Sequence, residues 1–137
     1  MKIHTTNYFD TFIEVAGDTK TIRSNVPTLK GDKRTVAFLQ YELLSKNPYR
    51  YTSDDLLFQV YALRNDLLQE EYKQAREQFF SKGQACLRAS PLAKTYGFGI
   101  HSDASGKIAL YGMETPAYQR FLDDPTITKQ RAMKSKR

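Results

Sequence analysis

The segment CLRASPLAKTYGFGIHSD, residues 86–103, gathers the residue types that most often carry out chemistry in proteins. It contains the only cysteine of the chain, one of its two histidines, two basic side chains and two closely spaced glycines. A thiol with cationic neighbours can act as a nucleophile, and a histidine can act as a base. Cys86 and His101 are therefore the candidate catalytic residues, against the more common case of a lone cysteine that is a small buried apolar side chain.

The same segment also offers hydrogen-bond donors for an anion. Arg88, Ser90 and Lys94 combine two cations with a hydroxyl group, which suits a carboxylate or a phosphate. The following strand places glycines and His101 on one face, where a ligand or another backbone can approach closely. The competing interpretation is an ordinary surface loop and a strand that packs under a helix. The predicted ligand-binding residues are Arg88, Ser90, Lys94, Tyr96 and His101, with Tyr111 as a further neighbour.

Common cofactor and metal motifs do not occur in the sequence. Gly97 and Gly99 lie inside a strand, without the third glycine and the following helix of a dinucleotide-binding motif. The glycine series and the Lys-Ser/Thr pair of a phosphate-binding loop are missing as well. Two histidines and one cysteine are too few and too widely spaced for a metal site. We therefore expect neither a cofactor nor a metal.

The formal charge of +6 is concentrated at the end of the chain. Five of the 21 basic residues and none of the 15 acidic residues lie in 128–137, so the rest of the chain is nearly neutral. This tail and the basic loop 17–34 could contact nucleic-acid phosphates without reading sequence. A helix predicted at 66–83 begins with acidic residues, which makes it a poor recognition helix. The contacts predicted for this alternative are Lys129, Arg131, Lys134, Lys136 and Arg137.

Hydrophobic periodicity and end signals predict an α+β fold. The segment 52–65 is the ambiguous one, because Thr52 and Asp55 form a capping-box pattern while the residues that follow also alternate like a strand. We favour a helix there. An antiparallel sheet of the N-terminal strand and a C-terminal hairpin, packed by three to four helices, follows from the order β-α-α-α-β-β-α. The predicted elements are a strand at 7–16, helices at 33–48, 52–65 and 66–83, a hairpin at 95–113 and a helix at 114–125.

Length and composition predict a single domain over 1–127, followed by a flexible basic tail at 128–137. A single cysteine allows no internal disulfide, which is typical of a reducing compartment. The sequence contains no apolar run long enough for a signal peptide or a membrane span. We therefore expect a cytoplasmic protein without a membrane partner.

Four runs of the sequence resemble a family of small bacterial proteins described only as a domain of unknown function. These runs are HTTNYFDTFIEVA, YTSDDLLFQV, CLRASPLAKTYGFGIHSD and RAMKSKR. The resemblance covers essentially the whole chain and implies a bacterial, single-domain, cytoplasmic protein. It also implies that the basic C-terminal segment belongs to the natural protein. It implies no reaction, cofactor or site residue.

Three functions are compatible with these observations. A binding domain for a small anionic ligand, using the loop and hairpin at 86–111, is the first. Nucleic-acid binding is the alternative, and a protein-interaction module is the third, since the chain has nine tyrosines and eight phenylalanines. An enzyme is not established by any of these features, nor is an oligomeric state. His4 precedes the first strand, so pairing of that strand with the hairpin would be needed to bring it near His101.

Overall fold

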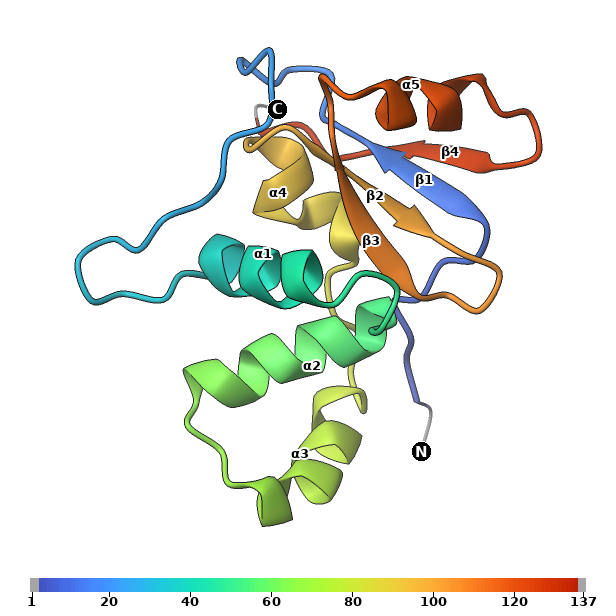
Figure 1. The fold of residues 1–137 in the computed structure, drawn as a ribbon. Coiled ribbons are helices and arrows are strands. Elements are labelled where there is room, and N and C mark those ends of the chain that lie inside the picture. Colours follow the sequence, from blue (N-terminus) through green and yellow to red (C-terminus); the bar gives the residue numbers. More distant parts are fainter. Residues whose placement is uncertain (1–2, 136–137) are drawn as a thin grey trace.

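A four-stranded mixed sheet organises the chain in the computed structural model, which describes residues 3–135 (Figure 1). The order across the sheet is β3-β2-β1-β4. The central strand β1 pairs antiparallel with β2 and parallel with β4, and β2 pairs antiparallel with β3. The strands are β1 (Thr11–Glu14), β2 (Phe98–Ser102), β3 (Ile108–Gly112) and β4 (Thr128–Arg131).

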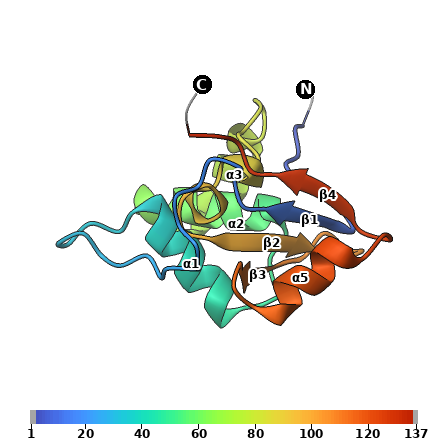
Figure 2. The ribbon, with the colours of Figure 1, turned by 90° about the horizontal axis from the view of Figure 1, so that it is seen from above.

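Helices cover both faces of this sheet unequally. Helices α1 and α4 pack on one face, and the short helix α5 lies alone on the other (Figures 1 and 2). Helices α2 and α3 extend from α1 away from the sheet. The helices are α1 (Val36–Lys46), α2 (Ser53–Arg64), α3 (Tyr72–Phe79), α4 (Pro91–Lys94) and α5 (Pro116–Asp123), with 3-10 turns η1 (Gln69–Glu71) and η2 (Leu87–Ala89).

The predicted α+β class and element order are confirmed, and the ambiguous segment 52–65 is a helix. A capping box favours the helix over a strand in this segment. The Asp55 N–H donates to the Thr52 hydroxyl, and the Thr52 N–H donates to the Asp55 carboxylate. Two satisfied donors at the start of α2 outweigh its weak alternating pattern. Thr115 caps α5 as predicted by accepting the Tyr118 N–H, with Pro116 at the first helical position.

Two segments differ from the sequence prediction. The predicted helix 66–83 does not start at Asp66, which has a left-handed φ of 51°; instead the Leu68 N–H donates to the Glu71 carboxylate and opens a 3-10 turn before α3. Residues 128–131, expected to belong to a flexible tail, form β4. That strand reads TKQR and lies at a sheet edge, so it has no apolar alternation to reveal it.

The main core lies between the sheet and the helices α1, α2 and α4. Its fully buried side chains come from every layer of the fold, as expected when the inward positions of strands meet the apolar stripes of helices. These side chains include Ile13, Leu44, Leu56, Leu87, Ile100 and Ile108.

A second, aromatic core fills the opposite face. Phe12 is fully buried there, stacked on Phe121 with ring centroids 4.9 Å apart and meeting the edge of Tyr118 at 5.0 Å. A Cβ atom on Gly99 would overlap the Phe12 ring and lie 2.7 Å from Tyr118. Gly97 has a φ of 80°, and its missing Cβ leaves room for the carbonyl of Arg23. Rings and loop backbone therefore occupy the glycine face.

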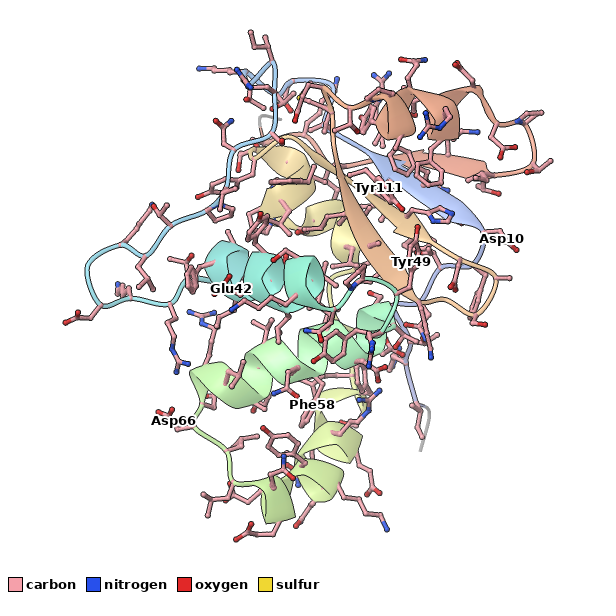
Figure 3. The ribbon with its side chains drawn as sticks, in the orientation of Figure 1. Asp10, Glu42, Tyr49, Phe58, Asp66 and Tyr111 are labelled. Atoms are coloured by element: carbon pink, nitrogen blue, oxygen red, sulfur yellow. The ribbon has the colours of Figure 1, made fainter. Side chains whose placement is uncertain are left out.

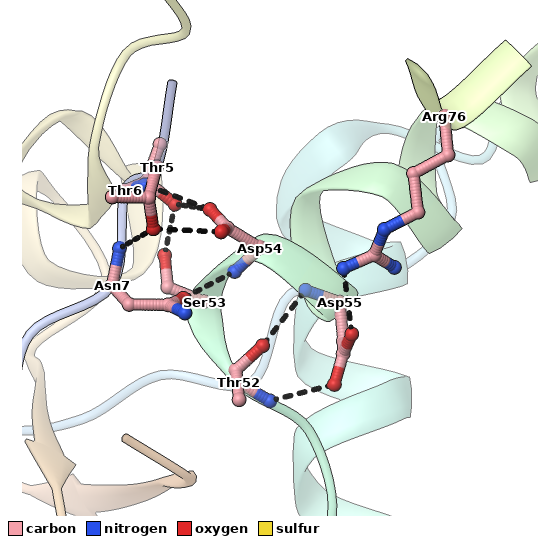
Figure 4. Close-up of polar contacts among 8 residues, drawn as sticks. All are labelled: Thr5, Thr6, Asn7, Thr52, Ser53, Asp54, Asp55 and Arg76. Atoms are coloured by element: carbon pink, nitrogen blue, oxygen red, sulfur yellow. Dashed lines mark hydrogen bonds and ion pairs between the residues drawn. The ribbon is translucent and has the colours of Figure 1, made fainter. Parts of the chain in front are cut away.

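The start of the chain is fastened to α2 by one carboxylate. Asp54 accepts hydrogen bonds of 2.7 Å from the Thr6 N–H, the Thr6 hydroxyl and the Thr5 hydroxyl (Figure 4). The Asp54 N–H donates in turn to the Asn7 side chain, and Thr6 also contacts the buried Ser53 hydroxyl. This set of bonds uses one N–H group at the start of α2 that has no partner within the helix, and it sets the direction in which the chain enters β1.

Gly99→Ala tests the packing of the aromatic core. We expect the free energy of unfolding to fall by about 1–3 kcal/mol, because the new methyl group must displace two enclosed rings. Gly83→Ala is the matched control, since a Cβ there meets only the His4 ring nitrogen at 3.9 Å. Urea denaturation of both variants measures the difference, and equal stabilities would contradict this packing.

Candidate functional site

Two tyrosines and a histidine form a polar cluster on the α5 face of the sheet. Tyr49 follows α1, and its φ of 58° is a left-handed conformation that is uncommon for a large side chain. The Tyr49 N–H donates to the Ile108 carbonyl, and the Ile108 N–H donates to the Tyr51 carbonyl. This pairing runs the segment along β3 and directs the Tyr49 hydroxyl toward the outer face (Figure 3).

The cluster is joined by two short hydrogen bonds. The Tyr49 hydroxyl lies 2.7 Å from His101 Nδ1 and 2.8 Å from the Tyr111 hydroxyl. Phe121 of α5 closes over both partners: its ring stacks on His101 with centroids 4.3 Å apart and meets Tyr111 edge-on with centroids 4.8 Å apart. The two side chains bonded to Tyr49 are therefore both covered by α5.

Burial determines the protonation of this cluster. It lowers the pKa of His101, although Asp103, Asp10 and Asp124 act in the opposite direction. Burial, followed by the contact with Tyr111, raises the pKa of Tyr49 far above its ordinary value. At neutral pH the imidazole is neutral and the phenol is protonated. The Tyr49 hydroxyl can then donate to Nδ1 and accept from Tyr111, so the cluster can hold a proton but contains no activated nucleophile.

The two candidate catalytic residues do not meet. The Tyr8 hydroxyl donates to Cys86 Sγ at 3.4 Å, and burial together with this bond raises the pKa of Tyr8 to about 12. Cys86 precedes η2, which packs against α4, whereas His101 stacks on Phe121 of α5. His4 is elsewhere again, because its N–H donates to the Phe80 carbonyl beyond α3. The structure thus assembles no cysteine–histidine pair from these residues.

Three of the predicted ligand-binding side chains serve the fold. Arg88 Nε donates to the Arg131 carbonyl at 2.7 Å and so holds the end of β4. The buried Ser90 hydroxyl donates to Gln40 at 2.6 Å and caps α4. Tyr96 packs against the cluster around Phe98. His101 belongs to the tyrosine cluster described above, and Lys94 lines a cavity.

That cavity, here called the lysine cavity, has a volume of about 370 Å³. Three segments enclose it: the loop after β1, the end of α4 and the chain after β4. The Ala16 N–H donates to the Ala93 carbonyl, and the Ser135 N–H donates to Asp18, so the segments are held together by hydrogen bonds. The lining residues are Asp18, Thr19, Lys20, Thr21, Lys94, Thr95 and Ser135.

The polar groups of the lysine cavity differ in whether they have hydrogen-bond or ion-pair partners. The Thr95 hydroxyl donates to the Pro91 carbonyl. The Thr19 hydroxyl oxygen is buried, and within residues 3–135 it has no hydrogen-bond partner. Lys20 and Lys94 form no ion pair with the acidic side chains that the structure describes. Sequence reasoning missed Thr19 and Lys20 because the loop that carries them lies some 70 positions before Lys94.

The predicted nucleic-acid contacts are spread over the edge of the sheet and beyond it. Lys129 Nζ donates to the carbonyls of Asp124 and Ile127 and is therefore occupied in closing the turn after α5. Arg131 and Lys134 are exposed. Lys136 and Arg137 lie outside the described residues.

Acidification should expose the role of His101. Its pKa in the folded state is below the value of about 6.5 that an exposed histidine has in the unfolded chain. As the pH falls below about 6.5, the unfolded chain takes up this proton first, and the free energy of unfolding decreases. We expect a titration of the His101 ring protons by NMR to give a pKa below about 6.5.

His101→Gln should flatten this acid-side decline in stability, measured by urea denaturation at several pH values. His4→Gln, which removes the other imidazole, is the matched control and should keep the decline. A His101 pKa at or above its ordinary value would contradict the buried, neutral imidazole.

The comparisons with known proteins come from sequence and structure together. No curated protein and no solved structure matches the chain. None of the helices in the described residues is both long and apolar enough to cross a membrane. A family model described as a family of unknown function, DUF6157, matches residues 3–137, which is essentially the whole sequence. The chain therefore belongs to the DUF6157 family.

Proposed function

We propose that this protein binds a small anionic molecule in the lysine cavity. The unpartnered Thr19 hydroxyl in the wall of that cavity carries the proposal. A buried hydroxyl group without a partner costs free energy, and native structures usually satisfy such groups with protein, water or ligand. Lys20 and Lys94 line the same cavity and supply the positive charge that an anion needs.

The size of the cavity favours a small molecule. Ligand pockets usually measure roughly 300–1,000 Å³, so a volume of about 370 Å³ is at the lower end. A phosphorylated or carboxylated compound of a few carbon atoms suits this volume better than a dinucleotide. Lysines bind phosphate as point charges without demanding one orientation, which is compatible with a flexible polar ligand.

Asp18 narrows the ligand class further. Its carboxylate accepts the Ser135 N–H and lines the same cavity as the two lysines. A carboxylate in the wall of the cavity opposes a ligand that carries several negative charges. The proposed ligand is therefore a small molecule with a single anionic group.

Of the ligand-binding residues predicted from the sequence, only Lys94 belongs to this proposed site. The loop 18–21 takes the place of the others. A location in a bacterial cytoplasm belongs to the same proposal. It is supported by the single unpaired cysteine and by the sequence resemblance described above.

The first test is a titration of the protein with inorganic phosphate, in which the NMR signals of the backbone amides are monitored. We expect the amide signals of 18–21, 94, 95 and 135 to shift and saturate together. Native mass spectrometry of protein purified gently from its own host should show a small adduct of defined mass that denaturation removes. Absence of both the shifts and the adduct would overturn the proposal.

Thr19→Val and Lys94→Gln separate binding from folding. Lys94→Gln should weaken phosphate binding at least tenfold, since a charged hydrogen bond contributes about 1.5–3 kcal/mol. Thr19→Val should also weaken binding, yet leave the free protein as stable or more stable, because it removes an unsatisfied buried hydroxyl. Lys107→Gln, on an exposed turn outside the cavity, is the matched control. Equal phosphate affinities in all three variants would contradict the assignment of this cavity.

A further inference from the structure

The helix α3 stands out because none of its residues is buried. It is held mainly by aromatic contacts to α2: Tyr61 and Phe79 lie with ring centroids 4.8 Å apart, and Phe58 meets both Tyr72 and Phe79 edge-on. An ion pair of 2.9 Å between Arg76 and Asp55 adds to these contacts (Figure 4). Tyr72, Ala75 and Phe79 are therefore only partly buried against α2, and the part of each that stays exposed is apolar surface available to a partner.

Two hollows flank the contact between α2 and α3 and form what we call the α3 groove. They measure about 650 and 520 Å³ and share Tyr61, Phe79 and Gln84. Tyr61 is 40% exposed, and the neighbouring Leu68 is 60% exposed. The larger hollow also contains Glu70 and Glu71 against a single Lys82. The smaller hollow contains Arg64, so the acidic character is confined to the larger hollow beside η1, and two aromatic rings lie where the hollows meet.

The segment 26–34, which we call the arm, has the opposite character. It projects from the body before α1 and turns at its tip, where Lys30 and Lys33 exchange backbone hydrogen bonds around Gly31 (Figure 1). Val26 and Leu29 are 56% and 49% exposed, so the arm presents two aliphatic side chains to solvent. Three basic residues and one acidic residue accompany them, namely Lys30, Lys33, Arg34 and Asp32.

We propose that the arm of one copy of this chain docks in the α3 groove of a second copy, and that the exchange is reciprocal. Aliphatic side chains of the arm would enter the aromatic centre of the groove, and its lysines would face Glu70 and Glu71. Opposite charges around an apolar centre are the usual anatomy of a specific interface.

The positions of the two surfaces support reciprocal exchange. Arg34 at the root of the arm lies 4.0 Å from Asp66 in the turn between α2 and α3 and donates to the Leu63 carbonyl. Arm and groove therefore lie next to each other on one side of the molecule (Figures 1 and 3). A two-fold axis through that side brings each arm toward the groove of the other copy, which is the closed, isologous arrangement common among homodimers.

Two double variants of the full-length chain test this proposal. Lys30→Glu with Lys33→Glu makes the tip of the arm acidic. Glu70→Lys with Gln74→Lys makes the larger hollow of the groove basic. Sedimentation and native mass spectrometry should show that the unaltered chain dimerises at concentrations from about 1 to 500 µM. Each variant alone should dimerise at least tenfold more weakly. Mixing the two should restore a heterodimer, because both of its contacts again join opposite charges.

Two further variants locate the contact. Leu29→Ser should weaken the dimer, since it removes an exposed aliphatic side chain of the arm without touching the core. Lys107→Glu makes a matched charge change on the hairpin turn and should leave the dimer unchanged. A monomer throughout the concentration range would overturn the proposal. So would a dimer indifferent to the arm and groove variants, or a monomer whose arm instead binds DNA or anionic vesicles.

Discussion

The fold depends on one side chain, Phe12, being enclosed on the face of the sheet that only α5 covers. β1 is a central strand, so its outward-facing residue must be buried by whatever the rest of the chain supplies. A helix of eight residues can cover that position only if the neighbouring strand presents no side chain there, and Gly99 meets this condition. The missing side chain of Gly99 therefore makes room for the rings of Phe12 and Tyr118 and not for a ligand.

The tyrosine cluster follows from the same constraint. Stacking of Phe121 on Phe12 fixes α5, and Phe121 then shields His101 and Tyr111 from water. Shielding lowers the pKa of the imidazole, and the hydroxyl of Tyr49 satisfies its Nδ1. The left-handed backbone at Tyr49 costs roughly 1–3 kcal/mol, and the pairing with Ile108 and the two hydroxyl bonds offset it. The cluster of Tyr49, His101 and Tyr111, which resembles an acid–base site, thus also forms the edge of the aromatic core.

Sequence reasoning succeeded where local chemistry decides the structure. Thr52 and Thr115 cap their helices as predicted, and the alternation that separates Ile100 from His101 is the one observed. It failed where distant segments meet. β4 is polar and gains its partner only because β1 lies beside it. The lysine cavity joins Lys20 to Lys94, although α1, α2 and α3 lie between them in the sequence. Neither a period nor a motif encodes such pairs, so Lys94 could be singled out while its neighbours could not.

The two proposed surfaces share one loop, yet the fold anchors them separately. Between the lysine cavity at 18–21 and the arm at 26–34, the Ser24 N–H and hydroxyl both donate to Glu114, which lowers the pKa of that carboxyl group. The Asn25 N–H donates to the Tyr96 carbonyl at the start of β2. These bonds fasten the middle of the loop to the sheet, so a displacement of the arm need not reach the cavity. Ligand binding and self-association are therefore expected to be independent properties, and loss of one leaves the other intact.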